Sequence, residues 1–161
     1  MMATMDSCSQ SSQKVYDPIR KIWVSATPEE LVRQQLLLRM TEDLGYPKEL
    51  LAIEKELSEF PHLKQQAVPQ RRIDILCFGR GNPPSDALYP LLLIECKKEK
   101  LTRGAKEQLL GYNSYVGASF VAACAKDEVL FGYRRGAEWE FLTFLPPYVQ
   151  LLASLESGRH G

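Results

Sequence analysis

Acidic and basic side chains that could act on a phosphodiester lie at the ends of two apolar segments. Asp74 interrupts the segment Arg72–Phe78 (RIDILCF), and Glu95 and Lys97 stand at the end of the segment Pro90–Cys96 (PLLLIEC). If both segments are strands, Glu95 and Lys97 share a face, because side chains two apart along a strand point the same way. Pairing the two strands as a hairpin would bring Asp74 beside them.

Two neighbouring carboxylates repel each other, and each is costly to desolvate beside an apolar strand. A bound divalent cation resolves both problems, and oxygen-only ligands suit Mg²⁺, which Mn²⁺ could replace. A lysine beside the cation can orient a water or neutralise charge that builds up on a phosphate. For either carboxylate alone, a structural salt bridge with Arg71, Arg72 or Lys97 is the favoured alternative. For the three together, we favour a metal-dependent hydrolytic site.

Several other chemistries are excluded by what the sequence lacks. The two histidines, His62 and His160, are too few for a multi-histidine metal site and poorly placed for a catalytic triad. No GxxxxGKS/T motif of a nucleotide-binding loop is present. The cysteines contain no CxxC pair, which predicts reduced thiols in a cytoplasmic protein, two or three of them in the core. These cysteines are Cys8, Cys77, Cys96 and Cys124.

The length and composition indicate one globular domain. The chain has 161 residues, 45% of them hydrophobic and 25% charged, and a formal net charge of +0. We expect a disordered N-terminal tail over residues 1–14, a single domain over 15–156 and a C-terminal tail over 157–161. The longest apolar stretch, Leu88–Ile94, is far too short to span a membrane, and the N-terminus does not resemble a secretory signal.

The order of the elements predicts a mixed α/β domain. A helix should begin after Thr27, because Thr27, Pro28 and Glu30 form the pattern of a capping box, and it should end by Gly45. The segment Leu50–Leu57 fits either a helix or a strand. We further expect a helix over 102–117, a strand over 119–125, a strand pair over 129–134 and 139–144, and a closing helix over 148–155.

The same residues resemble a known family. Arg71-Arg72-Ile73-Asp74, followed 21 positions later by Glu95-Cys96-Lys97, is similar to the PD-(D/E)xK nuclease superfamily, and more narrowly to the N-terminal nuclease domain of type I restriction enzyme R subunits. Further matching segments, over about residues 15–135, are Tyr16-Asp17-Pro18-Ile19-Arg20, Thr27-Pro28-Glu29-Glu30, Val32-Arg33-Gln34 and Gly45-Tyr46-Pro47.

The resemblance implies a fold, an activity and a set of site residues. It implies a restriction-endonuclease-like mixed sheet of four to six strands flanked by helices, with Leu50–Leu57 as a strand. Asp74 and Glu95 would be the metal ligands and Lys97 the catalytic lysine. Glu30 matches an additional acidic ligand, although its role as a capping residue is an equal alternative. Gln108 and Tyr112 match a QxxxY motif, share a helix face, and would contact DNA or brace the site.

We therefore expect Mg²⁺-dependent hydrolysis of DNA by an endonuclease domain without a motor. A homodimer or a separate protein partner would fit this reading, and RNA is a weaker alternative substrate. The second hypothesis is a catalytically silent nuclease fold that binds DNA or a protein, which the neutral net charge favours. Phosphate contacts would come from basic residues near the site. These are Arg71, Arg72, Lys98, Lys100, Arg103 and Lys106.

Overall fold

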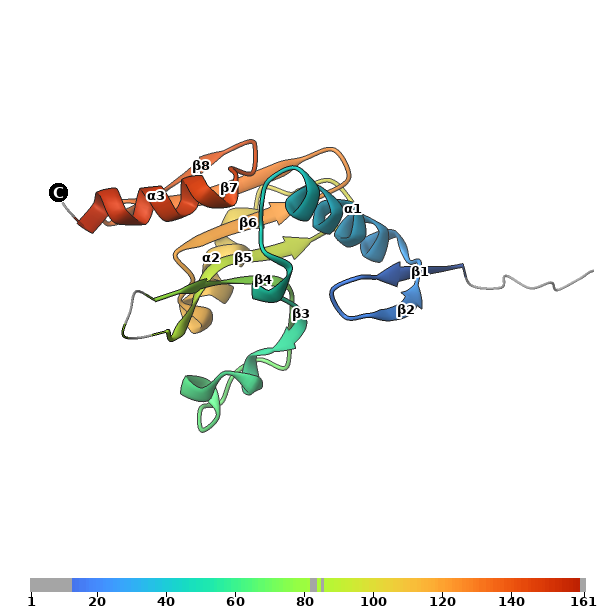
Figure 1. Cartoon of the computed structure of the whole chain (residues 1–161), viewed down its shortest axis with the longest axis horizontal. Helices are drawn as coiled ribbons and strands as arrows, with labels where there is room; N and C mark the ends of the chain where they lie inside the picture. The colour runs from blue at the N-terminus through green and yellow to red at the C-terminus, as the bar shows by residue number, and fades with distance from the viewer. Residues whose placement is uncertain (1–12, 82–83, 85, 160–161) are drawn as a thin grey trace, which may run out of the picture.

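The computed structural model describes residues 13–81, 84 and 86–159, which form a short hairpin followed by a six-stranded mixed sheet with helices on both faces (Figure 1). The strands of these residues are β1 (Lys14–Asp17), β2 (Ile22–Ser25), β3 (Leu51–Glu56), β4 (Arg72–Arg80), β5 (Leu88–Cys96), β6 (Phe120–Cys124), β7 (Val129–Arg135) and β8 (Glu138–Leu142). The helices are α1 (Pro28–Glu42), α2 (Ala105–Val116) and α3 (Tyr148–Arg159), with 3-10 turns at Lys48–Leu50, Leu57–Glu59 and Pro61–Leu63.

The large sheet runs in the order β3-β4-β5-β6-β7-β8, and β1 pairs only with β2. Strands β5 and β6 are parallel, because α2 carries the chain back across the sheet between them. The other pairs are antiparallel; Ile75 of β4, for example, lies opposite Ile94 of β5. The expected mixed sheet of four to six strands flanked by helices is therefore confirmed, at six strands.

Two apolar layers enclose the central strands. On one face, Leu37 of α1 packs in the same cluster as Leu92 of β5 and Leu151 of α3. On the other face, Leu109 of α2 packs in the same cluster as Leu93 of β5. Figure 1 shows α1 and α3 on one side of the sheet and α2 on the other. Covering on both faces explains why β4 and β5 are apolar almost throughout.

Helix α1 starts where the sequence predicts. Thr27 is the N-cap, and its hydroxyl oxygen accepts a hydrogen bond from the Glu30 backbone N–H at 3.1 Å. Only this half of the expected capping box forms, because the Glu30 carboxylate pairs with Arg20 and Arg33 instead. The helix ends at Glu42, and Gly45 follows with a φ of +73°.

Most other elements lie close to their expected positions. Leu51–Glu56 is a strand, as the family resemblance implies, and β4 and β5 form the expected antiparallel pair. The β1–β2 hairpin was not predicted, and α3 continues to Arg159, beyond the expected domain end at residue 156. The expected N-terminal tail lies largely outside the described residues, but its last residue, Lys14, begins β1.

The prediction that two or three cysteines lie in the core is confirmed. Cys77, Cys96 and Cys124 are buried free thiols, whereas Cys8 lies outside the described residues. In the part of the chain that the structure describes, no helix has the length and apolar character needed to cross a membrane.

Candidate active site

Asp74 lies where the side-chain alternation of β4 breaks. Ile73 and Ile75 are two positions apart, yet they pack in clusters on opposite faces of the sheet. On the paired strand β3, Glu54 adopts a left-handed φ of 54°, which is rare for a residue other than glycine. At this irregularity the Asp74 carboxylate reaches β5, where its Oδ2 accepts a hydrogen bond from the Cys96 backbone N–H at 2.7 Å.

This bond relates Asp74 to Glu95 and Lys97, the two other charged residues that the sequence indicates. Cys96 separates Glu95 from Lys97, so the Asp74 carboxylate lies against the backbone between them. Glu95 is only 6% exposed, and its Oε2 lies 3.4 Å from the Lys97 Nζ. The Lys97 side chain is 37% exposed and reaches solvent. Glu95 and Lys97 are therefore in contact at the end of β5, and the Asp74 carboxylate bonds to the backbone between them.

Tyr112 of α2 contacts the site through Arg71, which comes just before β4. Arg71 Nη2 lies 3.5 Å from Glu95 Oε2, and the Arg71 guanidinium lies 4.0 Å from the centroid of the Tyr112 ring. The ring and the carboxylate together hold the Arg71 side chain over the site, through a cation–π contact and an ion pair. The Tyr112 hydroxyl is buried and has no hydrogen-bond partner among the described residues. Tyr112 thus combines a buried ring with contact to a site residue.

Helix α1 holds Asp74 from the other side through Arg33. Arg33 Nη2 donates to Asp74 Oδ1 at 2.8 Å, and Nη1 donates to Glu30 Oε1 at 2.8 Å and to Glu54 Oε1 at 3.3 Å. Arg33 is 3% exposed, and burial alone would lower its pKa. The bond to Asp74 and the charges of these carboxylates outweigh burial and raise that pKa, so the guanidinium stays charged.

Arg20, in the turn of the β1–β2 hairpin, extends this network. Its Nη2 donates to Glu30 Oε1 at 2.7 Å, and its Nε donates to Asp17 Oδ2 at 2.6 Å. Asp17 is fully buried and also accepts from the Ile19 and Arg20 backbone N–H groups at 2.8 and 3.0 Å. Burial acts to raise the pKa of Asp17, but these hydrogen bonds outweigh it and place the pKa below its usual value of 3.8.

The two acidic residues that begin α1 differ in their surroundings. Glu30 is the expected additional ligand, but its carboxylate accepts hydrogen bonds from Arg20, Arg33 and Gln34, the last at 3.2 Å. Glu29 lies instead toward the acid and lysine set. Burial raises the pKa of Glu29 and the Asp74 carboxylate raises it further, whereas the charges of Arg33 and, less strongly, Lys97 oppose the shift. Glu29 also borders the same hollow as Lys97, whereas the Glu30 carboxylate is bonded to Arg20 and Arg33.

A hollow of about 390 Å³ opens between the start of α1 and the segment after β5. Glu29 and Gln108 line it, together with Lys97, Lys98 and Lys100. Gln108 also lines a neighbouring hollow of about 440 Å³ with Arg71 and Tyr112, the residue one turn later in α2. The QxxxY pair therefore borders the site from α2, and two of the expected basic residues border it from the loop.

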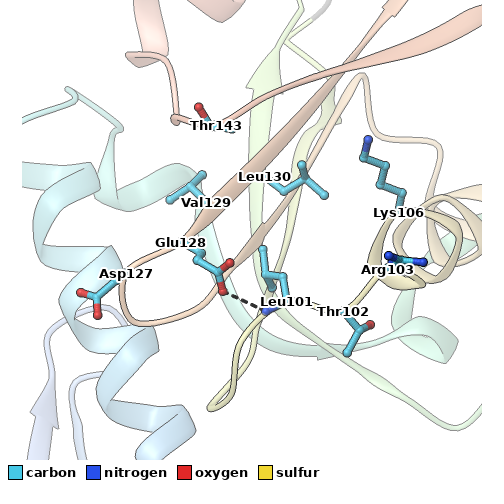
Figure 2. Close-up of a pocket in the computed structure, with 9 residues that line it drawn as sticks. All are labelled: Leu101, Thr102, Arg103, Lys106, Asp127, Glu128, Val129, Leu130 and Thr143. Atoms are coloured by element: carbon cyan, nitrogen blue, oxygen red, sulfur yellow. Dashed lines mark hydrogen bonds between the residues drawn. The ribbon is translucent and has the colours of Figure 1, made fainter.

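Two more of the expected basic residues line an adjoining hollow. Arg103 and Lys106 border this hollow of about 510 Å³, which shares Leu101 and Thr102 with the hollow of about 390 Å³. Figure 2 shows them on one side of that hollow and Asp127 and Glu128 on the other, so acidic groups offset the basic ones. Lys106 Nζ lies 4.8 Å from the Phe141 ring centroid.

Arg72, the last of the expected basic residues, forms ion pairs with two glutamates of the edge strand β3. Its Nε lies 3.3 Å from Glu56 Oε1 and its Nη1 lies 3.7 Å from Glu54 Oε2. Within the described residues, no group of three or more His, Cys, Asp or Glu side chains is already arranged to hold a metal ion.

Sequence reasoning missed Glu29, Arg33 and Arg20 as members of the site. One signal was available: Arg33 lies on the helical face of Leu36, Leu37 and Met40, where a charged residue needs a buried partner. No comparable signal existed for Arg20, whose role depends on a hairpin of two four-residue strands.

Comparisons with known proteins bear on the family of this chain. The family model for the N terminus of type I restriction enzyme R proteins matches residues 28–146, most of the chain. The curated proteins contain no match. Among solved structures, a fragment described as an HsdR subunit of a type I restriction enzyme from Vibrio vulnificus YJ016 aligns at 19% identity and a TM-score of 0.49, over 74% of this chain and 23% of that one. On the family match, this chain belongs to the family of type I restriction enzyme R protein N-terminal domains.

Proposed function

We propose that the chain is a nuclease domain that hydrolyses phosphodiester bonds of DNA with the help of a divalent cation. The observation that carries the proposal is the hydrogen bond from Cys96 N–H to Asp74 Oδ2, because it holds the Asp74 carboxylate against the backbone between Glu95 and Lys97. Membership of the restriction-enzyme family supports the same activity. Buried free thiols at Cys77, Cys96 and Cys124 suit a reducing cytoplasm.

The donor chemistry of the site fits Mg²⁺ or Mn²⁺. Asp74 and Glu95 would hold the cation, with Glu29 as the additional carboxylate in place of Glu30. All three offer only oxygen ligands, and each carboxylate oxygen has more than one acceptor position, so the existing bonds to Asp74 leave room for a cation. Burial and the neighbouring Asp74 carboxylate both raise the pKa of Glu29, and a cation would relieve the repulsion between the two carboxylates. When bound, the cation would supply positive charge at the phosphate and acidify a nearby water.

The chain's own residues would perform the other tasks. Lys97, half-exposed beside Glu95, would stabilise negative charge that develops on the phosphate. Arg71, held by Glu95 and the Tyr112 ring, would contact a neighbouring phosphate. Gln108 of α2 would orient the DNA backbone. Lys98 and Lys100 would add contacts that position the strand without reading its sequence.

The other basic residues have a secondary part in this proposal. Arg103 and Lys106 would contact DNA beyond the site, along the hollow of about 510 Å³. Arg72 would contact DNA at the edge of the sheet.

One observation favours the alternative of a catalytically silent module that binds DNA or a protein. Arg33 already neutralises the Asp74 carboxylate at 2.8 Å, so the fold can keep this partly buried acid ionised without a cation. The alternative leaves Lys97 without a task beyond its ion pair with Glu95.

The test is nicking of supercoiled plasmid and cleavage of single-stranded DNA in Mg²⁺ or Mn²⁺. We expect Lys97→Ala to lose two or more orders of magnitude in rate, as for removal of one preorganised charge stabiliser. Lys64→Ala, which changes an exposed lysine of the segment after Leu63, is the matched control and should retain the rate. If wild type and Lys97→Ala are equally inert with both metals, the proposal fails and the binding module becomes the better explanation.

A further inference from the structure

The outer face of the β1–β2 hairpin carries an exposed aromatic pair. Tyr16 lies opposite Trp23 in the register, and their ring centroids are 5.4 Å apart. Tyr16 is 44% exposed and Trp23 is 65% exposed, a large value for an indole. The neighbouring Asp17 points to the opposite face and is fully buried, so the aromatic rings are on the solvent side by strand alternation.

The charges around this pair are positive. Lys14 lies two positions before Tyr16 and therefore on the same face, while Lys21 is exposed at the turn. Asp17 is the sole acidic residue between positions 13 and 26, and it is buried against Arg20. The hairpin thus presents aromatic faces and lysines, with no exposed carboxylate of its own.

The hairpin is also tied to the candidate active site. Arg20, in its turn, bonds Glu30 at 2.7 Å; Glu30 bonds Arg33 at 2.8 Å; and Arg33 bonds Asp74 at 2.8 Å. This series of short charged contacts fixes the aromatic face relative to the strand that carries Asp74.

We propose that the Tyr16–Trp23 face binds single-stranded DNA by stacking on unpaired bases, and so guides an unpaired strand to the site. The proposal rests on the nuclease function proposed above. Aromatic side chains combined with basic groups are the usual means of holding single strands, because every unpaired base offers a π-face and each phosphate a negative charge. Bases inside a duplex are already stacked on one another and cannot reach these rings. The exposed indole therefore favours a single strand over a duplex.

The experiment measures binding without cleavage, in EDTA, by anisotropy of fluorescein-labelled dT20 and of the dT20·dA20 duplex. Trp23→Leu and Tyr16→Leu keep apolar bulk but remove the aromatic face, which separates stacking from the docking of an apolar protein surface. Phe144→Leu is the matched control, because Phe144 is 50% exposed and is not part of the hairpin. We expect tighter binding of dT20 than of the duplex and a roughly 10-fold rise in Kd for each hairpin variant. The control should stay within about twofold.

Intrinsic fluorescence provides a second measurement that does not depend on the Leu variants. Trp23 and Trp139 are the two tryptophans of the chain, and in Trp139→Phe the emission comes from Trp23 alone. Stacking predicts quenching of that emission when dT20 saturates the protein.

Two results would overturn the proposal in distinguishable ways. If dT20 binds but the Leu variants bind it equally well, or the Trp23 emission does not change, the hairpin is not a stacking surface and the nuclease proposal stands. If wild type binds neither dT20 nor the duplex and does not nick plasmid, both proposals fail together.

Discussion

Arg33 Nη2 donates to Asp74 Oδ1 at 2.8 Å, so a buried guanidinium of α1 holds the carboxylate at the irregular point of β4. The same guanidinium contacts Glu30 and Glu54, and Arg20 contacts both of these from the hairpin. Carboxylates that would otherwise repel are therefore arranged around two arginines. Helix α1, strands β3 and β4 and the hairpin meet in this one network.

Replacing Arg33 by methionine should destabilise the fold by about 3–5 kcal/mol, because it leaves the buried Glu30 carboxylate and the partly buried Asp74 carboxylate without their shared counter-charge. Urea unfolding at pH 7 measures the loss. Arg72→Met is the control: its ion pairs are exposed and should contribute no more than about 1 kcal/mol. Equal losses for the two variants would show that the buried network has no special weight.

The thiols of the core should be unreactive in the folded protein. Burial raises the pKa of Cys77 and of Cys124 to about 12, and raises that of Cys96 well above its usual value. At pH 8 almost no thiolate forms, and a disulfide reagent cannot reach the sulfur atoms. In Cys8→Ser, we expect no reacting thiol in buffer and three in urea. A thiol that reacts at once in buffer would contradict the packing of β4, β5 and β6.

Regular elements were predictable because each depends on a local pattern. Thr27 and Pro28 mark the start of α1, and the apolar segments of β4 and β5 indicate strands that are covered on both faces. The strand Leu51–Glu56 was not decidable from its own residues, since its Glu and Lys residues favour a helix whereas its alternation favours a strand. The family resemblance decided it correctly, because it adds information on the tertiary context.

The details of the site were less predictable, for a physical reason. Asp74, Glu95 and Lys97 could be grouped because a hairpin and strand alternation relate them. The choice between Glu29 and Glu30 depends on how α1 is rotated about its axis, which Arg20 and Arg33 help to set through distant contacts. The spacing of residues along the chain gives no information on those distant contacts.

Asp17 should stabilise the fold in a pH-dependent way. Its pKa in the folded protein is depressed, so the folded state favours the ionised form. The stabilisation is complete above the unfolded pKa of about 3.9 and is lost as the pH falls through the folded pKa. Asp17→Asn keeps an oxygen for the backbone N–H groups but loses the charge that faces Arg20. We expect it to cost about 3 kcal/mol at pH 7, the lower end for buried pairs.

Urea unfolding of wild type and Asp17→Asn at pH 7, 5 and 3.5 measures this dependence. The difference between the two proteins should be the same at pH 7 and 5 and smaller at pH 3.5. A difference that already declines between pH 7 and 5 would assign the effect to a group with a higher pKa than Asp17.

The two acidic residues at the start of α1 should separate activity from stability. Glu29→Gln removes a half-exposed carboxylate beside Asp74 and Lys97, so nicking in Mg²⁺ should fall by at least tenfold while the urea midpoint changes little. Glu30→Gln removes the carboxylate that joins Arg20 to Arg33, so the urea midpoint should fall clearly. Its activity per folded molecule should fall less than that of Glu29→Gln. The reverse pattern would return the role of additional ligand to Glu30, and would mean that the Arg20–Glu30–Arg33 contacts rearrange when the site is occupied.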